Sequence, residues 1–174
     1  MPNSLSLLRL ICAPLFLFVI FNSLKIQALL ILLCGAASDF FDGYFARKLK
    51  VESKFGELLD PLADKIFSNV VLWGIYFYFK APFPILLVAV FLTVRDCALL
   101  IGGGAVLTKK LTVDIKPIYA SKICTALIFT LCILSVIFNP NLLLLKILSV
   151  ICLLLIIFTF FKYIGNFLRT SRHP

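Results

Sequence analysis

The sequence predicts an all-α protein that crosses a membrane about six times. Its 174 residues are 62% hydrophobic and only 14% charged, and their mean hydropathy is +1.11. Soluble domains of this length are closer to half apolar, so this balance is typical of a polytopic membrane protein. The chain is long enough for one compact bundle, and we expect residues 1–174 to form a single transmembrane domain.

Six apolar stretches are each long enough to span a bilayer as a helix, which takes ~20 residues. They cover residues 5–22, 26–48, 56–79, 83–107, 117–138 and 142–164. The first follows a Pro-Asn-Ser sequence that is typical of a helix start, although Arg9 is also compatible with a short interfacial helix leading into the span. The segments KAPFP at 80–84 and NPN at 139–141 predict turns between later spans.

The basic residues predict how the bundle is oriented. With six spans, both termini, the second-to-third connection and the fourth-to-fifth connection share one side, and that side carries twelve Lys and Arg residues. The other side carries only Lys25 and Lys80. The positive-inside rule then places both termini in the cytoplasm of a bacterial inner membrane, or on the equivalent side of a mitochondrial inner membrane. Topology also explains the net charge of +9 without nucleic-acid binding.

The cysteines and the single histidine do not predict a metal site or a catalytic centre. The six cysteines lie in or beside apolar stretches and form no CxxC or Cys/His spacing, which is the pattern of small buried side chains. His173 lies in the polar C-terminal tail. Catalysis by histidine inside the bundle is therefore excluded.

One segment does not suit a lipid-facing bundle, namely SDFFDGYFARKLKVESKFGELLDPLADK at residues 38–65. Asp39 and Asp42 lie before the end of the second span, and Asp60 and Asp64 lie inside the third. A carboxylate at such a depth costs ~2.5–3.5 kcal/mol, so these residues require a polar cavity and partners. The spacings of three and four residues place each pair on one face of its helix.

The two acidic helix faces can meet, because the short connection makes the second and third spans antiparallel neighbours. Four converging carboxylates repel one another unless cations lie among them, and oxygen ligands without His or Cys indicate Mg²⁺, Mn²⁺ or Ca²⁺. Gly43, Ala46 and Gly56 leave room for a bulky ligand against these helices. Arg47 adds a fixed positive charge that suits a phosphate.

The spacing D-x2-D-G-x2-A-R-x8-G-x3-D-x3-D resembles the defining motif of the CDP-alcohol phosphatidyltransferase family. All eight positions of that motif are matched, at Asp39, Asp42, Gly43, Ala46, Arg47, Gly56, Asp60 and Asp64. The six-span layout and the opening PNSLSLLRLICAPLF are also similar to the family, so the resemblance covers essentially the whole chain.

The resemblance implies an enzyme that moves a phosphatidyl group from CDP-diacylglycerol to an alcohol and releases CMP. By analogy, Asp39, Asp42 and Asp60 hold two divalent ions, Mg²⁺ or Mn²⁺, which bridge the diphosphate. Asp64 takes the proton of the attacking hydroxyl and also touches a metal. The residues implied to bind CDP-diacylglycerol are Gly43, Ala46, Arg47 and Gly56. The family also implies a homodimer.

The acceptor alcohol is less well determined. Arg95, Lys116 and Lys122 are candidates to bind it, while a structural ion pair or positive-inside anchoring are the alternative roles. Arg95 and Asp96 point ~100° apart on a helix and are not expected to pair simply with each other. The sequence looks like the branch with glycerol-type acceptors, which favours sn-glycerol 3-phosphate. Cardiolipin synthesis from phosphatidylglycerol is the alternative.

A cation transporter is the competing class, because transporters also use intramembrane carboxylates. Transport would not require Gly and Ala at fixed offsets from those carboxylates. The sequence also shows no broken helix and no inverted repeat. Release of CMP from CDP-diacylglycerol separates the two classes.

Overall fold

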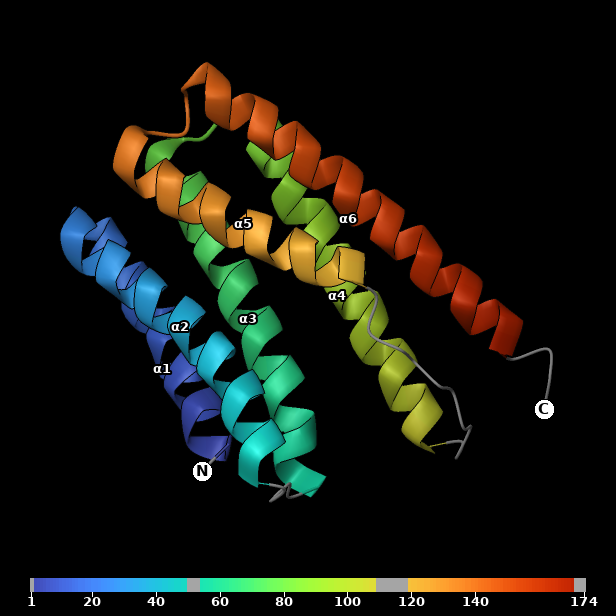
Figure 1. Ribbon diagram of the computed structural model, residues 1–174. Helices are drawn as coiled ribbons and strands as arrows, with labels where there is room; N and C mark the ends of the chain where they lie inside the picture. The colour runs from blue at the N-terminus through green and yellow to red at the C-terminus, as the bar shows by residue number, and fades with distance from the viewer. Residues whose placement is uncertain (1, 50–53, 109–118, 171–174) are drawn as a thin grey trace.

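The computed structural model describes residues 2–49, 54–108 and 119–170, with side chains described for 6–38, 62–101 and 120–165. Within these residues there is no strand, which confirms the all-α prediction. The helices pass alternately up and down, and α1 begins and α6 ends at the lower end of the bundle in Figure 1. They are α1 (Pro2–Phe21), α2 (Lys25–Leu49), α3 (Lys54–Phe79), α4 (Phe83–Thr108), α5 (Tyr119–Phe138) and α6 (Leu143–Thr170).

The predicted spans and the observed helices agree to within three residues at every boundary except one. The exception is the end of α6, which continues to Thr170 where the sequence predicts an end at 164. Apolar residues become sparse there, but a helix can extend past the membrane-buried part of its sequence. Arg9 lies inside a single continuous α1, and no separate short helix precedes the span in the described residues.

Three tight turns join the helices at the upper end of the bundle. Each contains one residue in the left-handed region, namely Ser23 (φ 62°), Lys80 (φ 48°) or Asn139 (φ 67°). At the end of α1 the amide of Leu24 donates to the carbonyl of Val19 at 3.1 Å, which is the Schellman arrangement. The amide of Ala81 donates to Tyr76 at 3.1 Å in the same way after α3. These turns confirm the turn predictions at 80–84 and 139–141.

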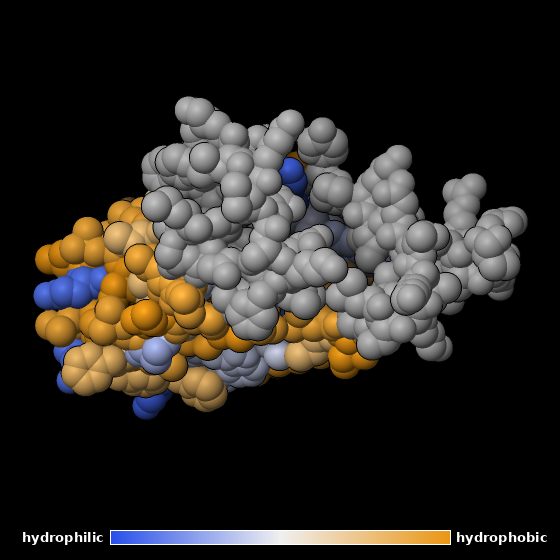
Figure 2. Space-filling model, turned by 90° about the horizontal axis from the view of Figure 1, so that it is seen from below, coloured by the Kyte–Doolittle hydropathy of each residue, from blue (hydrophilic) through white to orange (hydrophobic). Residues whose placement is uncertain are grey.

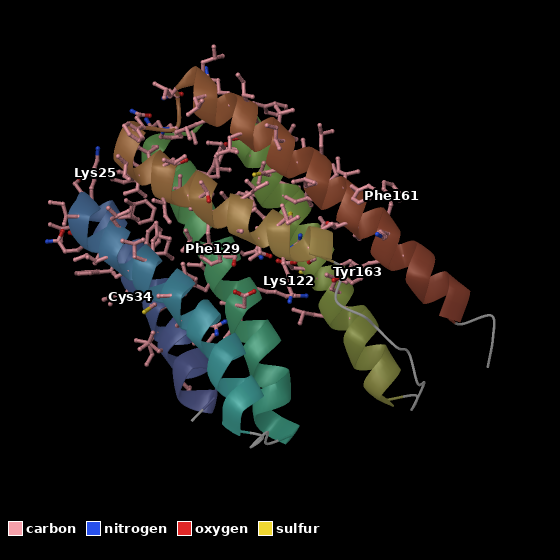
Figure 3. All side chains as sticks on the ribbon, viewed as in Figure 1. Lys25, Cys34, Lys122, Phe129, Phe161 and Tyr163 are labelled. Atoms are coloured by element: carbon pink, nitrogen blue, oxygen red, sulfur yellow. The ribbon has the colours of Figure 1, made fainter. Side chains whose placement is uncertain are left out.

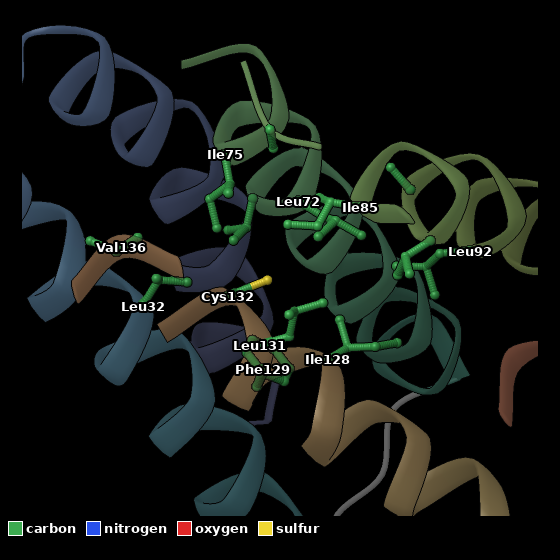
Figure 4. Close-up of a cluster of buried hydrophobic side chains, with 14 of the residues drawn as sticks. Leu32, Leu72, Ile75, Ile85, Leu92, Ile128, Phe129, Leu131, Cys132 and Val136 are labelled. Atoms are coloured by element: carbon green, nitrogen blue, oxygen red, sulfur yellow. The ribbon is translucent and has the colours of Figure 1, made fainter. Parts of the chain in front are cut away.

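The core lies around α3, which packs against α1, α4 and α5. α1 packs against α2 and α3, α4 packs against α3 and α6, and α5 packs against α2, α3 and α6. Buried Leu, Ile, Val and Phe side chains fill the space between them (Figure 4). The ring of Phe67 stacks on that of Phe129 with centroids 6.1 Å apart, and Gly35 of α2 lies directly against Phe67. Phe67 therefore joins three helices at one point.

The outer surface is that of a membrane protein. Three segments of the described residues are long and apolar enough to cross a membrane, at Phe83–Ile101, Ala120–Phe138 and Leu143–Gly165. α1 and α2 contribute the shorter apolar helices Ser6–Phe21 and Lys25–Ser38. In Figure 2 the coloured part of the surface is mostly hydrophobic. A surface of this kind is suited to contact with lipid rather than water.

Candidate active site

The four aspartates of the acidic segment lie on two continuous helices. Asp39 and Asp42 belong to α2, and Asp60 and Asp64 belong to α3. Because both helices run through these positions without a break, each pair lies on one helix face, as the spacing predicts. Asp64 is the member of the group whose side chain is described. The remaining predicted motif residues have side chains outside the described part, namely Asp39, Asp42, Gly43, Ala46, Arg47, Gly56 and Asp60.

Asp64 lies beside Arg9, a residue that the sequence reading did not include in the site. The Nη1 atom of Arg9 is 3.7 Å from Oδ1 of Asp64. The Arg9 side chain is 2% exposed, while that of Asp64 is 27% exposed. The pair joins α1 to α3 and keeps a positive charge next to the carboxylate. An arginine inside an apolar helix is expensive unless partnered, and that cost was the signal that could have identified Arg9.

Asp64 lines a pocket that lies between α3, α4, α5 and α6. The pocket has a volume of about 140 Å³. Most of its lining residues carry a charge or a hydroxyl group, in contrast to the apolar core beside it. These polar lining residues are Asp64, Lys65, Ser68, Arg95, Asp96, Ser121, Thr125 and Tyr163. A cavity of this size and polarity suits a small, multiply hydrogen-bonding molecule rather than an acyl chain.

Arg95 pairs with its neighbour Asp96, so the expectation that these two residues would not pair was wrong. The Nε and Nη2 atoms of Arg95 donate to Oδ1 of Asp96 at 3.0 and 2.9 Å. Both side chains are almost fully buried. The guanidinium group is long enough to fold back over the ~100° between adjacent positions, and burial away from water favours that contact.

The Arg95–Asp96 pair is anchored to α3 and α5 by further hydrogen bonds. Asn69 Nδ2 donates to Oδ2 of Asp96 at 3.0 Å, and Arg95 Nη1 donates to Sγ of Cys124 at 3.5 Å. The hydroxyl of Thr93 lies 2.7 Å from the Oδ1 atom of Asn69 and accepts a hydrogen bond from Trp73 Nε1 at 3.1 Å. This chain of polar contacts joins α3 to α4 and holds Arg95 and Asp96, which line the pocket, in place.

Of the two lysines predicted to bind the acceptor, the structure describes one. Lys122 lies near the start of α5 with its side chain exposed, and it is not among the residues that line the pocket. Figure 3 places it toward the same end of the bundle as Tyr163, and far from Lys25. Lys116 lies outside the described residues.

The residues present are compatible with hard divalent cations. Among the described side chains, no three His, Cys, Asp or Glu residues gather into a metal-binding group. The predicted ligand set, however, consists of Asp64 together with three aspartates whose side chains are outside the described part. Asp60 lies one helical turn before Asp64 on α3, so the two positions share a helix face. Carboxylate oxygens form the donor set that Mg²⁺ and Mn²⁺ prefer.

Comparisons with known proteins identify the family of this chain. The family model described as CDP-alcohol phosphatidyltransferase matches residues 1–161. A protein of Aquifex aeolicus named CDP-diacylglycerol–glycerol-3-phosphate 3-phosphatidyltransferase is 36% identical over 168 residues, which cover 93% of this chain and 92% of that protein. Proteins of the same name match over shorter segments. That of Cereibacter sphaeroides is 45% identical over 75 residues (41% of this chain, 34% of that protein), and that of Wigglesworthia glossinidia brevipalpis 40% over 83 residues (46% of each).

Proposed function

This chain belongs to the CDP-alcohol phosphatidyltransferase family, and we propose that it transfers the phosphatidyl group of CDP-diacylglycerol to sn-glycerol 3-phosphate. The products would be phosphatidylglycerophosphate and CMP, as a step of phospholipid biosynthesis. The observation that carries the proposal is Asp64, whose carboxylate lies at a small polar pocket at the end of the family motif. The name of the Aquifex aeolicus relative, which matches along nearly its whole length, supports the choice of acceptor.

Asp64 is the proposed general base. A hydroxyl of the acceptor gives its proton to this carboxylate, and the hydroxyl oxygen forms a bond to the phosphorus that carries the diacylglycerol. The bond between that phosphorus and the oxygen bridging to the cytidyl phosphate breaks, and CMP leaves with the bond's electron pair. Arg9 lies 3.7 Å from this carboxylate and would hold it in place at the pocket. Such positioned bases commonly contribute ~10²–10⁴ in rate.

The motif residues on α2 and the start of α3 would bind the nucleotide end of CDP-diacylglycerol. Asp39, Asp42 and Asp60, together with Asp64, would hold one or two Mg²⁺ or Mn²⁺ ions. When bound, these ions would supply positive charge that neutralises the diphosphate and the departing CMP. The residues proposed to surround the nucleotide are Gly43, Ala46, Arg47 and Gly56.

The acceptor would enter the pocket between α3, α4, α5 and α6. At about 140 Å³ the pocket is on the scale of a phosphorylated three-carbon alcohol. Arg95 forms one wall of it, and the exposed cation of Lys122 near the start of α5 would attract anions toward that end of the bundle. Lys116 would act in the same way. Phosphatidylglycerol as acceptor, the cardiolipin synthase alternative, would have to place two further acyl chains beside this polar space.

The active site would face the cytoplasm, or the equivalent side of a mitochondrial inner membrane. The excess of basic residues on the side that holds both termini supports this orientation. We also propose that the enzyme acts as a homodimer, on the basis of family membership alone.

A product assay over several acceptors tests the proposal. Purified protein in detergent with Mg²⁺ or Mn²⁺ receives CDP-diacylglycerol and one of sn-glycerol 3-phosphate, phosphatidylglycerol, serine or inositol phosphate. CMP and lipid products are then measured by mass spectrometry. We expect CMP and phosphatidylglycerophosphate in equal amounts with sn-glycerol 3-phosphate. Cardiolipin formed preferentially from phosphatidylglycerol would assign the acceptor differently, and absence of CMP with every acceptor would contradict the enzyme class.

A further inference from the structure

The pocket contains one cation, Lys65, that the proposed mechanism does not use. It follows Asp64 directly on α3, and its half-buried side chain lines the same pocket. Within the described part of the chain Lys65 makes neither a hydrogen bond through its side chain nor an ion pair. Half-buried lysines of this kind are costly unless a negative group compensates them.

The other charges of the pocket are already matched to one another. Arg95 directs two nitrogen atoms at Asp96, and the second oxygen of Asp96 accepts a hydrogen bond from Asn69. Asp64 lies next to Arg9. The charge of the Arg95 guanidinium is therefore largely neutralised by Asp96, and the side chain is held in place as part of the pocket wall. Lys65 is the pocket's cation without a hydrogen bond or an ion pair in the described part of the chain, and the carboxylates of Asp64 and Asp96 are near enough to act on its charge.

Hydroxyl groups complete an anion-binding environment around this charge. Ser68 lies on α3, Ser121 and Thr125 on α5, and Tyr163 on α6, and all four line the pocket. Ser68 donates to the backbone carbonyl of Asp64 at 2.8 Å and Thr125 to that of Ser121 at 3.1 Å. Within the described residues, Ser121 and Tyr163 are therefore the lining hydroxyls whose protons remain for a phosphate beside the Lys65 ammonium. The carboxylate of Asp64 would repel an anion at its own position, so the phosphate would lie against the ammonium group of Lys65 and away from that carboxylate.

We propose that Lys65 binds the phosphate group of the acceptor and thereby places the acceptor hydroxyl at Asp64. A three-carbon alcohol phosphate carries its hydroxyl and its phosphate at opposite ends. Asp64 and Lys65, which are consecutive on α3, both line the pocket, so one can receive the hydroxyl and the other the phosphate. Lys65 thus selects a phosphorylated acceptor over a neutral alcohol. The inference rests on the proposed function and adds to it the residue that determines acceptor choice.

The test measures the KM for sn-glycerol 3-phosphate and the KM for CDP-diacylglycerol separately in Lys65→Gln, Lys65→Arg and wild type. We expect Lys65→Gln to raise the acceptor KM by roughly 10- to 100-fold, the range for losing one charge-assisted contact. The KM for CDP-diacylglycerol should change less than about twofold, and Lys65→Arg should recover part of the loss because it keeps the charge.

Two other lysines serve as controls. Lys146→Gln removes a charge from another half-buried lysine on α6, seventeen residues or ~25 Å along the helix from Tyr163, and should leave both KM values unchanged. Lys122→Gln removes an exposed charge. Its effect on the acceptor KM should be smaller and should disappear at high salt, whereas the effect of Lys65→Gln should persist.

A binding measurement separates this contact from folding and from turnover. sn-Glycerol 3-phosphate should raise the thermal unfolding temperature of the wild-type protein, and glycerol should not. The shift should be lost in Lys65→Gln, while the unfolding temperature without ligand stays near that of the wild type.

Three outcomes would overturn the inference while the wild type remains active. They are an unchanged acceptor KM in Lys65→Gln, an equal rise in the KM for both substrates, and a large salt-independent effect in Lys122→Gln instead. A wild-type protein that releases no CMP would contradict the proposed function itself, which is a distinguishable result.

Discussion

At the scale of single residues, the aspartates of the motif should divide into a base and metal ligands. Asp64→Asn keeps the shape of the side chain and one oxygen for a metal, but it cannot accept a proton at neutral pH. We therefore expect turnover to fall by ~10²–10⁴ while CDP-diacylglycerol still binds. Asp39→Asn should weaken metal binding, so excess Mg²⁺ or Mn²⁺ should restore part of its activity.

Metal titrations of both variants check this division. If excess metal rescues Asp64→Asn as well as it rescues Asp39→Asn, Asp64 is mainly a ligand. If Asp64→Asn keeps near-normal turnover, the base is another residue. The wild type stripped of metal and kept in excess chelator provides the control, and we expect it to be inactive.

Arg9 should stabilise the fold through Asp64. Removing one partner of a buried ion pair leaves an uncompensated charge, and because Asp64 is partly exposed we expect Arg9→Met to cost roughly 2–3 kcal/mol. Arg9→Lys should cost less. Denaturant unfolding in detergent of Arg9→Met, Asp64→Asn and the double variant gives the coupling between them. Strictly additive effects would show that the contact at 3.7 Å contributes nothing to stability.

Contacts between individual side chains were the features that could least be predicted from the sequence. The spacing of the aspartates predicts their shared helix faces, because 3.6 residues per turn follows from backbone geometry alone. The pairing of Arg95 with Asp96 could not be predicted in that way, since it depends on the reach of a flexible side chain and on burial between α3, α4 and α5. The contact of Arg9 with Asp64 joins two helices distant in sequence, which no local pattern encodes.

At the scale of helices, the contact between α2 and α3 depends on a glycine. A Cβ atom at Gly35 would collide with the ring of Phe67, which is itself buried and stacked on Phe129. The buried ring would have to shift to accommodate the added methyl group. We expect Gly35→Ala to destabilise the protein by roughly 1–3 kcal/mol, as other overpacked core positions do.

Gly165→Ala is the matched control, because nothing lies within 4 Å of a Cβ built at that position of α6. Alanine favours a helix over glycine by up to ~1 kcal/mol, so this variant should be neutral or slightly more stable. Thermal unfolding in detergent compares the two variants. Equal stability of Gly35→Ala and Gly165→Ala would contradict the close approach of α2 to Phe67.

The helix boundaries were the most predictable feature of this protein. A run of apolar residues of bilayer length has no alternative to a helix within lipid, because every backbone group must be paired inside the segment. The turns at Lys80 and Asn139 were readable from proline and asparagine. The extension of α6 to Thr170 was not, because Lys162 and Arg169 end the apolar run without ending the helix.

At the scale of the whole molecule, both termini should lie in the cytoplasm. The start of α1 and the end of α6 lie at the same end of the bundle, and that side of the chain carries twelve basic residues against two on the other. A green fluorescent protein fused after Pro174 should therefore fluoresce in a bacterial host, and one fused in the turn after Lys80 should not. The reverse pattern would place the pocket and the motif on the opposite side of the membrane.

The central claim is that an acceptor hydroxyl attacks the phosphatidyl phosphorus of CDP-diacylglycerol, and isotope labelling tests it most directly. The purified protein is supplied with CDP-diacylglycerol and sn-glycerol 3-phosphate that carries ¹⁸O in its primary hydroxyl group. We predict that the label appears in phosphatidylglycerophosphate, in the oxygen that joins glycerol to the new phosphodiester, and that the released CMP is unlabelled. Release of phosphatidic acid together with a labelled cytidylyl ester of glycerol phosphate would show attack at the other phosphorus and would contradict the account.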